Sequence, residues 1–77
     1  MVHHRSMRWE TLAKRIGRNI QKIRTEKGFT QEQAAERSHD LSLRHWQYLE
    51  AGKKNLTVNT LIALSKALDV DIKALLS

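Results

Sequence analysis

The chain contains no cysteine and no proline, and only three of its 77 residues are glycine. Without cysteine it can form neither a disulfide nor a thiolate metal site. The lack of proline and the scarcity of glycine favour helices joined by short connections. No apolar run is long enough to cross a membrane, and no apolar signal segment follows Met1. The sequence therefore predicts a cytoplasmic protein with one helical domain and one small core.

Positive charge is concentrated at one end of the sequence. The formal net charge is +6, and residues 1–27 contain eight Lys or Arg residues against two Glu. Residues 28–77 contain six basic and six acidic residues, so the whole excess lies in the first segment. Such asymmetry favours a polyanionic partner, either nucleic acid or an acidic membrane surface. An ordinary solvated helix face explains the charge equally well.

Apolar residues recur at the spacing of amphipathic helices, and no alternating strand pattern occurs. Residues that favour the N-cap position precede four of the helical segments: Thr30, Ser42, Thr57 and Asp71. Gly28 and Gly52 stand where helices would stop. We expect a single all-α domain over residues 8–77, with helices at about 8–27, 31–38, 43–51, 58–68 and 72–76. Residues 1–7 show no periodicity and are predicted to be disordered.

The helix predicted from Leu43 onward separates into two faces when its residues are plotted at about 100° per residue. Trp46 and Leu49 share a narrow apolar side, which predicts that both belong to the core. The opposite side carries Arg44, Gln47, Tyr48 and Ala51. Arg and Gln can hydrogen-bond to base edges, and Ala leaves room for close approach, so this side suits a DNA major groove. An ordinary solvated face is the alternative.

Two stretches match a known family: F-T-Q-E-Q-A-A-E-R at residues 29–37, and W-Q-Y-L-E-A-G-K-K-N-L-T-V-N-T-L-I-A-L-S-K-A-L-D-V at residues 46–70. They resemble the helix-turn-helix DNA-binding domains of the Cro and phage-repressor type, the XRE family. The resemblance covers about residues 16–76, nearly the whole chain. It implies a compact five-helix, lambda-repressor-like fold. Restriction–modification controller proteins are a narrower resemblance, because they too consist of little beyond this domain. A prophage regulator fits the same features equally well.

The resemblance assigns roles to individual residues. The base-reading positions are Leu43, Arg44, Gln47 and Tyr48. The DNA phosphate contacts are Gln31, Lys53, Lys54 and Asn55. The structural positions are Arg24, Ala35, Trp46, Leu49 and Glu50. Arg24 and Glu50 are expected to pair between the first and third helices, since a half-buried carboxylate without a partner is costly.

The turn between the second and third helices departs from the family pattern. It has one residue more than usual, and the usual turn glycine is missing, with Ser38-His39-Asp40-Leu41 in its place. His39 or Asp40 is expected to adopt the left-handed conformation that glycine would supply, and Asp tolerates it better than most residues. The aim of the third helix depends on this turn.

The sequence thus predicts a transcriptional regulator that binds double-stranded DNA, as a two-fold dimer on a palindromic operator. The expected dimer surface is the C-terminal end, where apolar side chains exceed what so short a helix need bury: Val70, Ile72, Leu75 and Leu76. Alternatively, these side chains fold back to close the core, and we expect some of them to do so. The alternative is a protein-interaction module, such as an antitoxin that binds a toxin and represses its own operon. No catalytic constellation, metal-ligand spacing or phosphate loop occurs, so we expect no enzyme activity and no cofactor.

Overall fold

The computed structural model describes residues 2–53 and 56–77. Five helices cover this part of the chain: α1 (Val2–Glu26), α2 (Gln31–Ser38), α3 (Leu43–Glu50), α4 (Val58–Leu68) and α5 (Ile72–Leu76). The described residues contain no strand. The all-α, five-helix architecture that the sequence predicted is confirmed. Over the same residues, no helix is both long enough and apolar enough to span a membrane.

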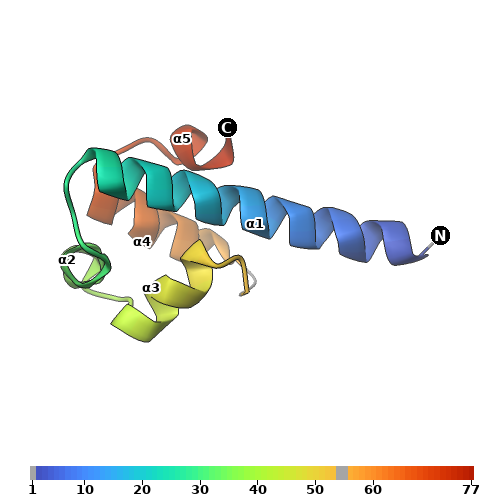
Figure 1. Cartoon of the computed structure of the whole chain (residues 1–77), viewed down its shortest axis with the longest axis horizontal. Coiled ribbons are helices and arrows are strands. Elements are labelled where there is room, and N and C mark those ends of the chain that lie inside the picture. The colour runs from blue at the N-terminus through green and yellow to red at the C-terminus, as the bar shows by residue number, and fades with distance from the viewer. Residues whose placement is uncertain (1, 54–55) are drawn as a thin grey trace.

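Helix α1 is longer than its apolar pattern predicted. It begins at Val2 rather than near residue 8, so the segment expected to be disordered is helical from Val2 onward. Its N-terminal part extends beyond the other helices (Figure 1). No glycine or proline occurs between Val2 and Ile16, so nothing in the backbone ends the helix there. A stripe of apolar residues marks the part of a helix that packs against a core. A helical segment that extends beyond the core can form without such a stripe, so the pattern did not predict it.

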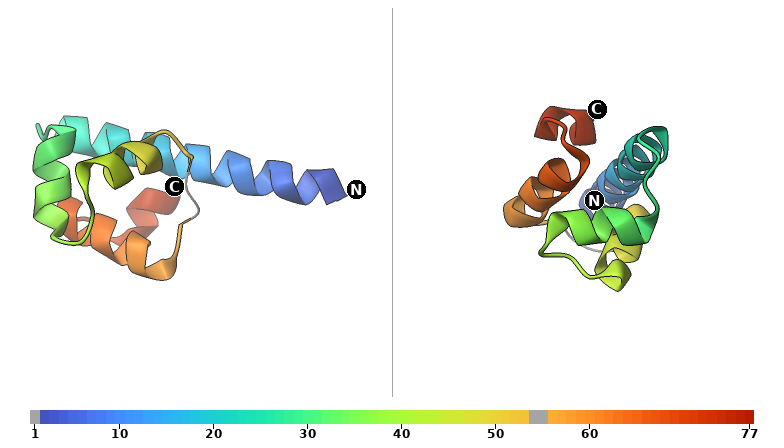
Figure 2. Two further views of the ribbon diagram at one scale, coloured as in Figure 1. Left: turned by 90° about the horizontal axis from the view of Figure 1, so that it is seen from below. Right: turned by 90° about the vertical axis from the view of Figure 1, so that its left-hand side faces the viewer.

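The helices surround one small core. Helix α1 packs against α3 and α5, while α2 packs against α3 and α4 (Figure 2). The largest fully buried side chains come from α1, α3, α4 and α5: Ile20, Trp46, Leu64, Leu68 and Leu75. Helix α2 contributes only small buried residues to this core, Ala34 and Ala35. Small side chains let neighbouring helices cross closely, which is why α2 can lie against two helices at once.

Four of the helices begin at the predicted N-cap residues. The Thr30 hydroxyl accepts the Gln33 backbone N–H at 3.0 Å, and the Gln33 side chain accepts the Thr30 N–H at 2.9 Å. This is the predicted capping box. Ser42, Thr57 and Asp71 cap α3, α4 and α5. In each case one side-chain oxygen accepts a backbone N–H of the first turn.

The α2–α3 turn is held by a buried serine. Ser38 Oγ donates to the Ala35 carbonyl at 2.6 Å and accepts the Leu41 N–H at 3.0 Å. His39 takes the left-handed conformation, with φ of 63°. Of the two residues proposed for this role, the structure therefore selects His39 over Asp40. Hydrogen bonds within the turn hold His39 at a positive φ, a backbone conformation that glycine adopts without steric cost.

Side chains of α1 hold the C-terminal helix in place. Asn19 Nδ2 donates to the carbonyls of Leu75 at 2.9 Å and Ser77 at 3.1 Å. Arg15 Nη2 donates to the Leu76 carbonyl at 2.9 Å. These bonds satisfy carbonyls that a helix end leaves without partners, and Leu75 is driven fully into the core. Leu75 is one of the four C-terminal apolar residues for which a dimer surface and the core were both expected, and its burial places it in the core.

The left-handed His39 generates a prediction for stability. We expect His39→Gly to stabilise the fold by about 1 kcal/mol, because glycine adopts positive φ without the penalty of a Cβ atom. Urea unfolding followed by circular dichroism measures the change. Asp40→Gly is the matched control, since Asp40 does not have positive φ and should lose stability. Equal losses in both variants would contradict the prediction.

Candidate functional site

The carboxylate of Glu50, at the end of α3, lies at a junction of three helices. Arg24 of α1 forms an ion pair with it through Nε and adds a second bond from Nη2 at 3.1 Å. Trp46 Nε1 donates to Glu50 Oε2 at 2.6 Å. Gln31 Nε2, at the start of α2, donates to Oε1 at 3.0 Å. The Arg24 and Glu50 side chains are only 11% and 5% exposed. We call these four side chains the Glu50 hub.

The hub satisfies the groups that it buries. Arg24 uses Nη1 for a further bond to the Phe29 carbonyl at 2.8 Å, which ties the α1–α2 connection to it. Among the described residues, no buried side-chain nitrogen or oxygen lacks a hydrogen-bond partner. A buried carboxylate is tolerated when opposite charge and hydrogen bonds replace its water, as they do here.

Two glycines allow the chain to cross α1 closely beside the hub. A Cβ atom on Gly17 would lie 2.5 Å from the Glu50 carbonyl oxygen and 2.6 Å from that of Leu49. Gly52 has φ of 71°, and a Cβ atom there would lie 2.8 Å from Lys14 Cα. Gly17 is therefore the residue that lets the end of α3 rest directly on the backbone of α1.

The apolar anchors of α3 face inward and its polar residues face out. Trp46 and Leu49 are 0% and 2% exposed. The outward side carries the four residues expected to read bases: Leu43, Arg44 and Gln47 are exposed, and Tyr48 is half-buried. Arg44 lies along Tyr48, with Nε 3.3 Å from the phenol oxygen and its guanidinium carbon 5.8 Å from the ring centroid. The structure thus brings these four side chains to one face of one helix.

The residues expected to contact phosphate flank that face. Gln31 is the first residue of α2, and its side chain is engaged with Glu50 and, through Oε1, with Gln47 Nε2 at 3.4 Å. Lys53 is exposed, and its backbone N–H donates to the Tyr48 carbonyl at 3.0 Å. Lys54 and Asn55 lie outside the described residues. Gln31 and Lys53 thus both lie near the C-terminal end of α3, Gln31 against Glu50 and Lys53 three residues beyond it.

The arrangement of α2, a short turn and α3 is the geometry of a helix-turn-helix. The sequence pattern of the helix-turn-helix family matches residues 20–75, most of the chain. The chain belongs to the helix-turn-helix family. It is of the Cro/C1 type, as the sequence predicted, and this makes it a transcriptional regulator of that family rather than an enzyme.

Individual relatives agree with this assignment. The chain is 42% identical over 59 residues to the uncharacterized HTH-type transcriptional regulator y4dJ of Sinorhizobium fredii, covering 77% of this chain and 75% of that protein. It is similar in structure to the restriction–modification controller protein C.AhdI from Aeromonas hydrophila, with a TM-score of 0.78, 28% identity, and coverage of 82% and 94% of the two chains. A threonine-to-alanine mutant of the controller protein C.Esp1396I gives a TM-score of 0.77, 34% identity, and coverage of 84% and 85%.

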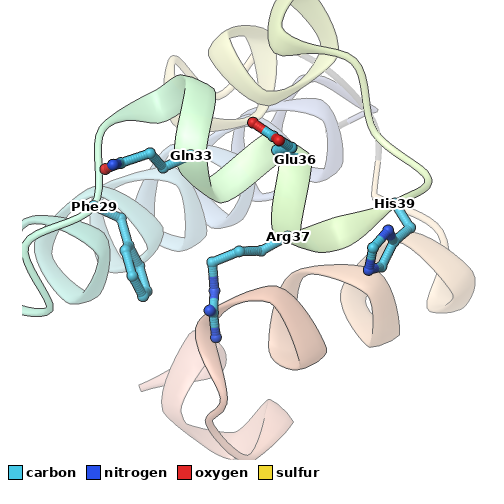
Figure 3. Close-up of a pocket in the computed structure, with 5 residues that line it drawn as sticks. All are labelled: Phe29, Gln33, Glu36, Arg37 and His39. Carbon is cyan, nitrogen blue, oxygen red and sulfur yellow. The ribbon is translucent and has the colours of Figure 1, made fainter.

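A shallow hollow of this helix-turn-helix protein lies away from α3, beside α2. Figure 3 shows Phe29 and Arg37 projecting toward each other in it. The Arg37 guanidinium stacks 4.5 Å from the Phe29 ring centroid, and its Nε donates to the Ala67 carbonyl at 2.7 Å. Arg37 therefore fastens α2 to the end of α4, and we assign the hollow a structural role.

Sequence reasoning missed Gly17, Trp46 Nε1 and the engagement of Gln31 with Glu50. An isolated glycine inside a helical pattern is a signal for close packing, and it could have identified Gly17. The Trp46 and Gln31 bonds depend on where three helices meet, which no local pattern specifies.

The hub generates a prediction for the fold of this regulator. Glu50→Gln places an amide N–H₂ among donors from Arg24, Trp46 and Gln31, and leaves the Arg24 charge buried without a counter-ion. We expect a loss of about 3–5 kcal/mol in the free energy of unfolding, measured by urea titration. The exposed Glu26→Gln is the matched control and should change stability by less than about 0.5 kcal/mol. A Glu50→Gln loss as small as that of the control would contradict the role given to the hub.

Proposed function

We propose that this regulator reads the major groove of double-stranded DNA with α3, as a two-fold dimer on a palindromic operator. The observation that carries the proposal is the outward face of α3, which presents Arg44, Gln47 and Tyr48 while Trp46 and Leu49 anchor the opposite side. The major groove admits an α-helix, and Leu43 in the first turn of α3 offers apolar contact to a thymine methyl group. Membership of the family supports the same reading.

Arg44 is the residue best suited to specify a base. Its Nε lies 3.3 Å from the Tyr48 hydroxyl, and the two terminal nitrogens take no part in that bond. Two parallel N–H donors match the O6 and N7 acceptors of guanine. Tyr48 thus holds the guanidinium in a defined pose, and a held side chain loses less entropy on binding.

Phosphate contacts would position the helix without specifying sequence. Gln31 lies at the N-terminus of α2, where backbone N–H groups and the helix dipole favour an anion. Lys53 supplies charge just beyond the C-terminal end of α3, and we keep Lys54 and Asn55 with it in this proposal. Three exposed basic residues of α1, Lys14, Arg18 and Lys22, add to the positive field that attracts DNA.

The direct test is selection of bound sequences from random duplex DNA. We expect one enriched palindrome, and a binding constant that falls steeply with salt because each neutralised phosphate contributes roughly −0.9 to the slope. Arg44→Ala should weaken binding to that operator by about 1–3 kcal/mol, and weaken binding to random DNA much less. Arg44→Lys is the matched control: it keeps the charge, so it should lose specificity but retain affinity for random DNA. Equal losses of affinity on the operator and on random DNA would show that Arg44 contacts only phosphate. If the selection enriched no sequence, the proposal would be refuted.

The dimer surface that we propose adjoins α5. Leu76 is 40% exposed and lies at the rim of an apolar pocket of about 140 Å³, with Leu12, Ala13, Ile16, Leu56 and Leu61. Exposed apolar surface beside an apolar pocket is the composition of a self-complementary interface. With Leu75 buried in the core, Leu76 is the residue of this set that we place at the centre of the dimer surface, while Ile72 and Val70 are half-buried.

A substitution at Leu76 tests the dimer. We expect Leu76→Asp to shift the protein from dimer to monomer in sedimentation equilibrium, and to weaken operator binding, because a charge replaces apolar contact area. Lys73→Asp, an exposed change on the same helix, should leave the dimer intact. An unchanged dimer in Leu76→Asp would place the interface elsewhere. Copurification with a second small protein in place of a dimer would favour the antitoxin alternative.

A further inference from the structure

We propose that the projecting N-terminal part of α1, residues 2–10, is a dimerisation arm that packs against a second copy of the chain. The inference rests on the dimer in the proposed function, and it adds a second contact to the surface around Leu76. The helix-turn-helix pattern matches residues 20–75, so the arm lies outside the part of the chain that defines the family. Membership of the family therefore does not account for it.

The arm leaves the rest of the protein at the apolar pocket beside Leu76. Among the residues that line this pocket, Leu12, Ala13 and Ile16 belong to α1. Beyond Leu12, α1 continues past the ends of α4 and α5 (Figure 1, Figure 2). Between Leu12 and Val2 the helix extends about 15 Å, at a rise of about 1.5 Å per residue.

Two-fold symmetry places the arm beside the partner. A two-fold dimer brings the same patch of both copies together. When the pocket and Leu76 form that patch, the arm of each copy starts at the interface and continues alongside the other copy. No glycine or proline occurs between Val2 and Ile16, so the helix has no position at which it would kink away. The arm then lies against the surface of the partner.

The area that a stable dimer requires favours the same arrangement. Stable interfaces bury about 800 Å² on each partner. Helix α5 has five residues, and beside it the dimer surface offers Leu76, which is 40% exposed, and a pocket of about 140 Å³. This surface is too small to supply the required area alone. The arm adds a further helix face at its edge.

The sequence of the arm suits contact with protein better than contact with DNA. Residues 2–13 contain two basic residues and one acidic residue, whereas residues 14–27 contain six basic residues and one acidic residue. The excess positive charge therefore lies mainly outside the arm. The sequence places Trp9 three residues before Leu12 and four before Ala13, the spacing of one helix face. Tryptophan is enriched at protein interfaces.

The arm also needs a packing partner to remain helical. The first turn of α1 contains Arg5 and no acidic residue, and positive charge at a helix N-terminus opposes the helix dipole. Helical segments shorter than about 12 residues are marginal in water without packing. Contact with a second copy supplies that packing.

The first experiment measures the dimer dissociation constant of the full chain by sedimentation equilibrium, without DNA. Trp9→Gln should raise this constant at least about tenfold, the effect expected of a tryptophan buried at an interface. Arg8→Gln is the matched control. It makes the same replacement one residue earlier, about 100° around the helix, and should change the constant less than about twofold. Thermal unfolding by circular dichroism shows that both variants are folded.

A second experiment uses tryptophan fluorescence. Trp46 is fully buried, so quenching by iodide reports mainly on Trp9. We expect Trp9 to be shielded in the wild-type dimer, and to be quenched severalfold more strongly in Leu76→Asp, the variant expected to be monomeric. Equal quenching in the two proteins would show that the partner does not cover the arm.

The outcomes separate the arm from the proposed function. If Leu76→Asp dissociates the dimer and Trp9→Gln leaves the constant unchanged, the arm is refuted and the dimer surface at Leu76 stands. If both arm variants weaken operator binding without changing the dimer constant, the arm contacts DNA, which also overturns the inference. If the wild-type protein is monomeric without DNA, the arm fails together with the dimer, while an enriched operator would still uphold DNA reading by α3.

Discussion

The carboxylate of Glu50 is the constraint on which the placement of α3 depends. It accepts bonds from Arg24, Trp46 and Gln31, which lie on α1, α3 and α2. A buried ion pair contributes little net stability over apolar packing, because removing both charges from water offsets their attraction. Directional bonds restrict orientation in a way that apolar contacts do not, since apolar surfaces of similar shape can slide. We therefore attribute the orientation of the outward face of α3 to the hub, and most of the stability to the core around Trp46 and Leu64.

Local chemistry explains how much of the fold could be predicted from sequence. The N-caps at Thr30 and Ser42 act within a few residues of themselves, so their signals survive in any tertiary context. The start of α1 was not predictable in the same way, because periodicity reports which residues are buried. The burial of Leu75 was also not predictable, because an apolar residue near the end of the sequence can pack either against a partner or into the core. Asn19 holds α5 against α1 through bonds to the Leu75 and Ser77 carbonyls, and these bonds join positions far apart in the sequence.

In the candidate site, too, local features could be predicted from the sequence, while contacts between distant residues could not. The two faces of α3 follow from helix geometry alone, and the family resemblance supplied the pairing of Arg24 with Glu50. The participation of Gln31 could not be read from sequence, because a glutamine at the first position of a helix looks like a phosphate contact whether or not a carboxylate lies behind it. The packing of Gly17 depends on the arrival of the Leu49 and Glu50 carbonyls from the far end of α3.

The α2–α3 turn shows how the two ends of α3 come under separate control. Ser38 and His39 hold this turn, and the structure aligns with C.AhdI at a TM-score of 0.78. The hub acts apart from the turn, because it joins the start of α2 to the end of α3, at the opposite end of both helices. Gln47 lies near the hub, and its pose follows from those bonds. Arg44 lies in the first turn of α3, beyond the Ser42 cap, so its position depends on the turn. A change at residues 38–41 should therefore re-aim Arg44 while leaving Gln47 in place.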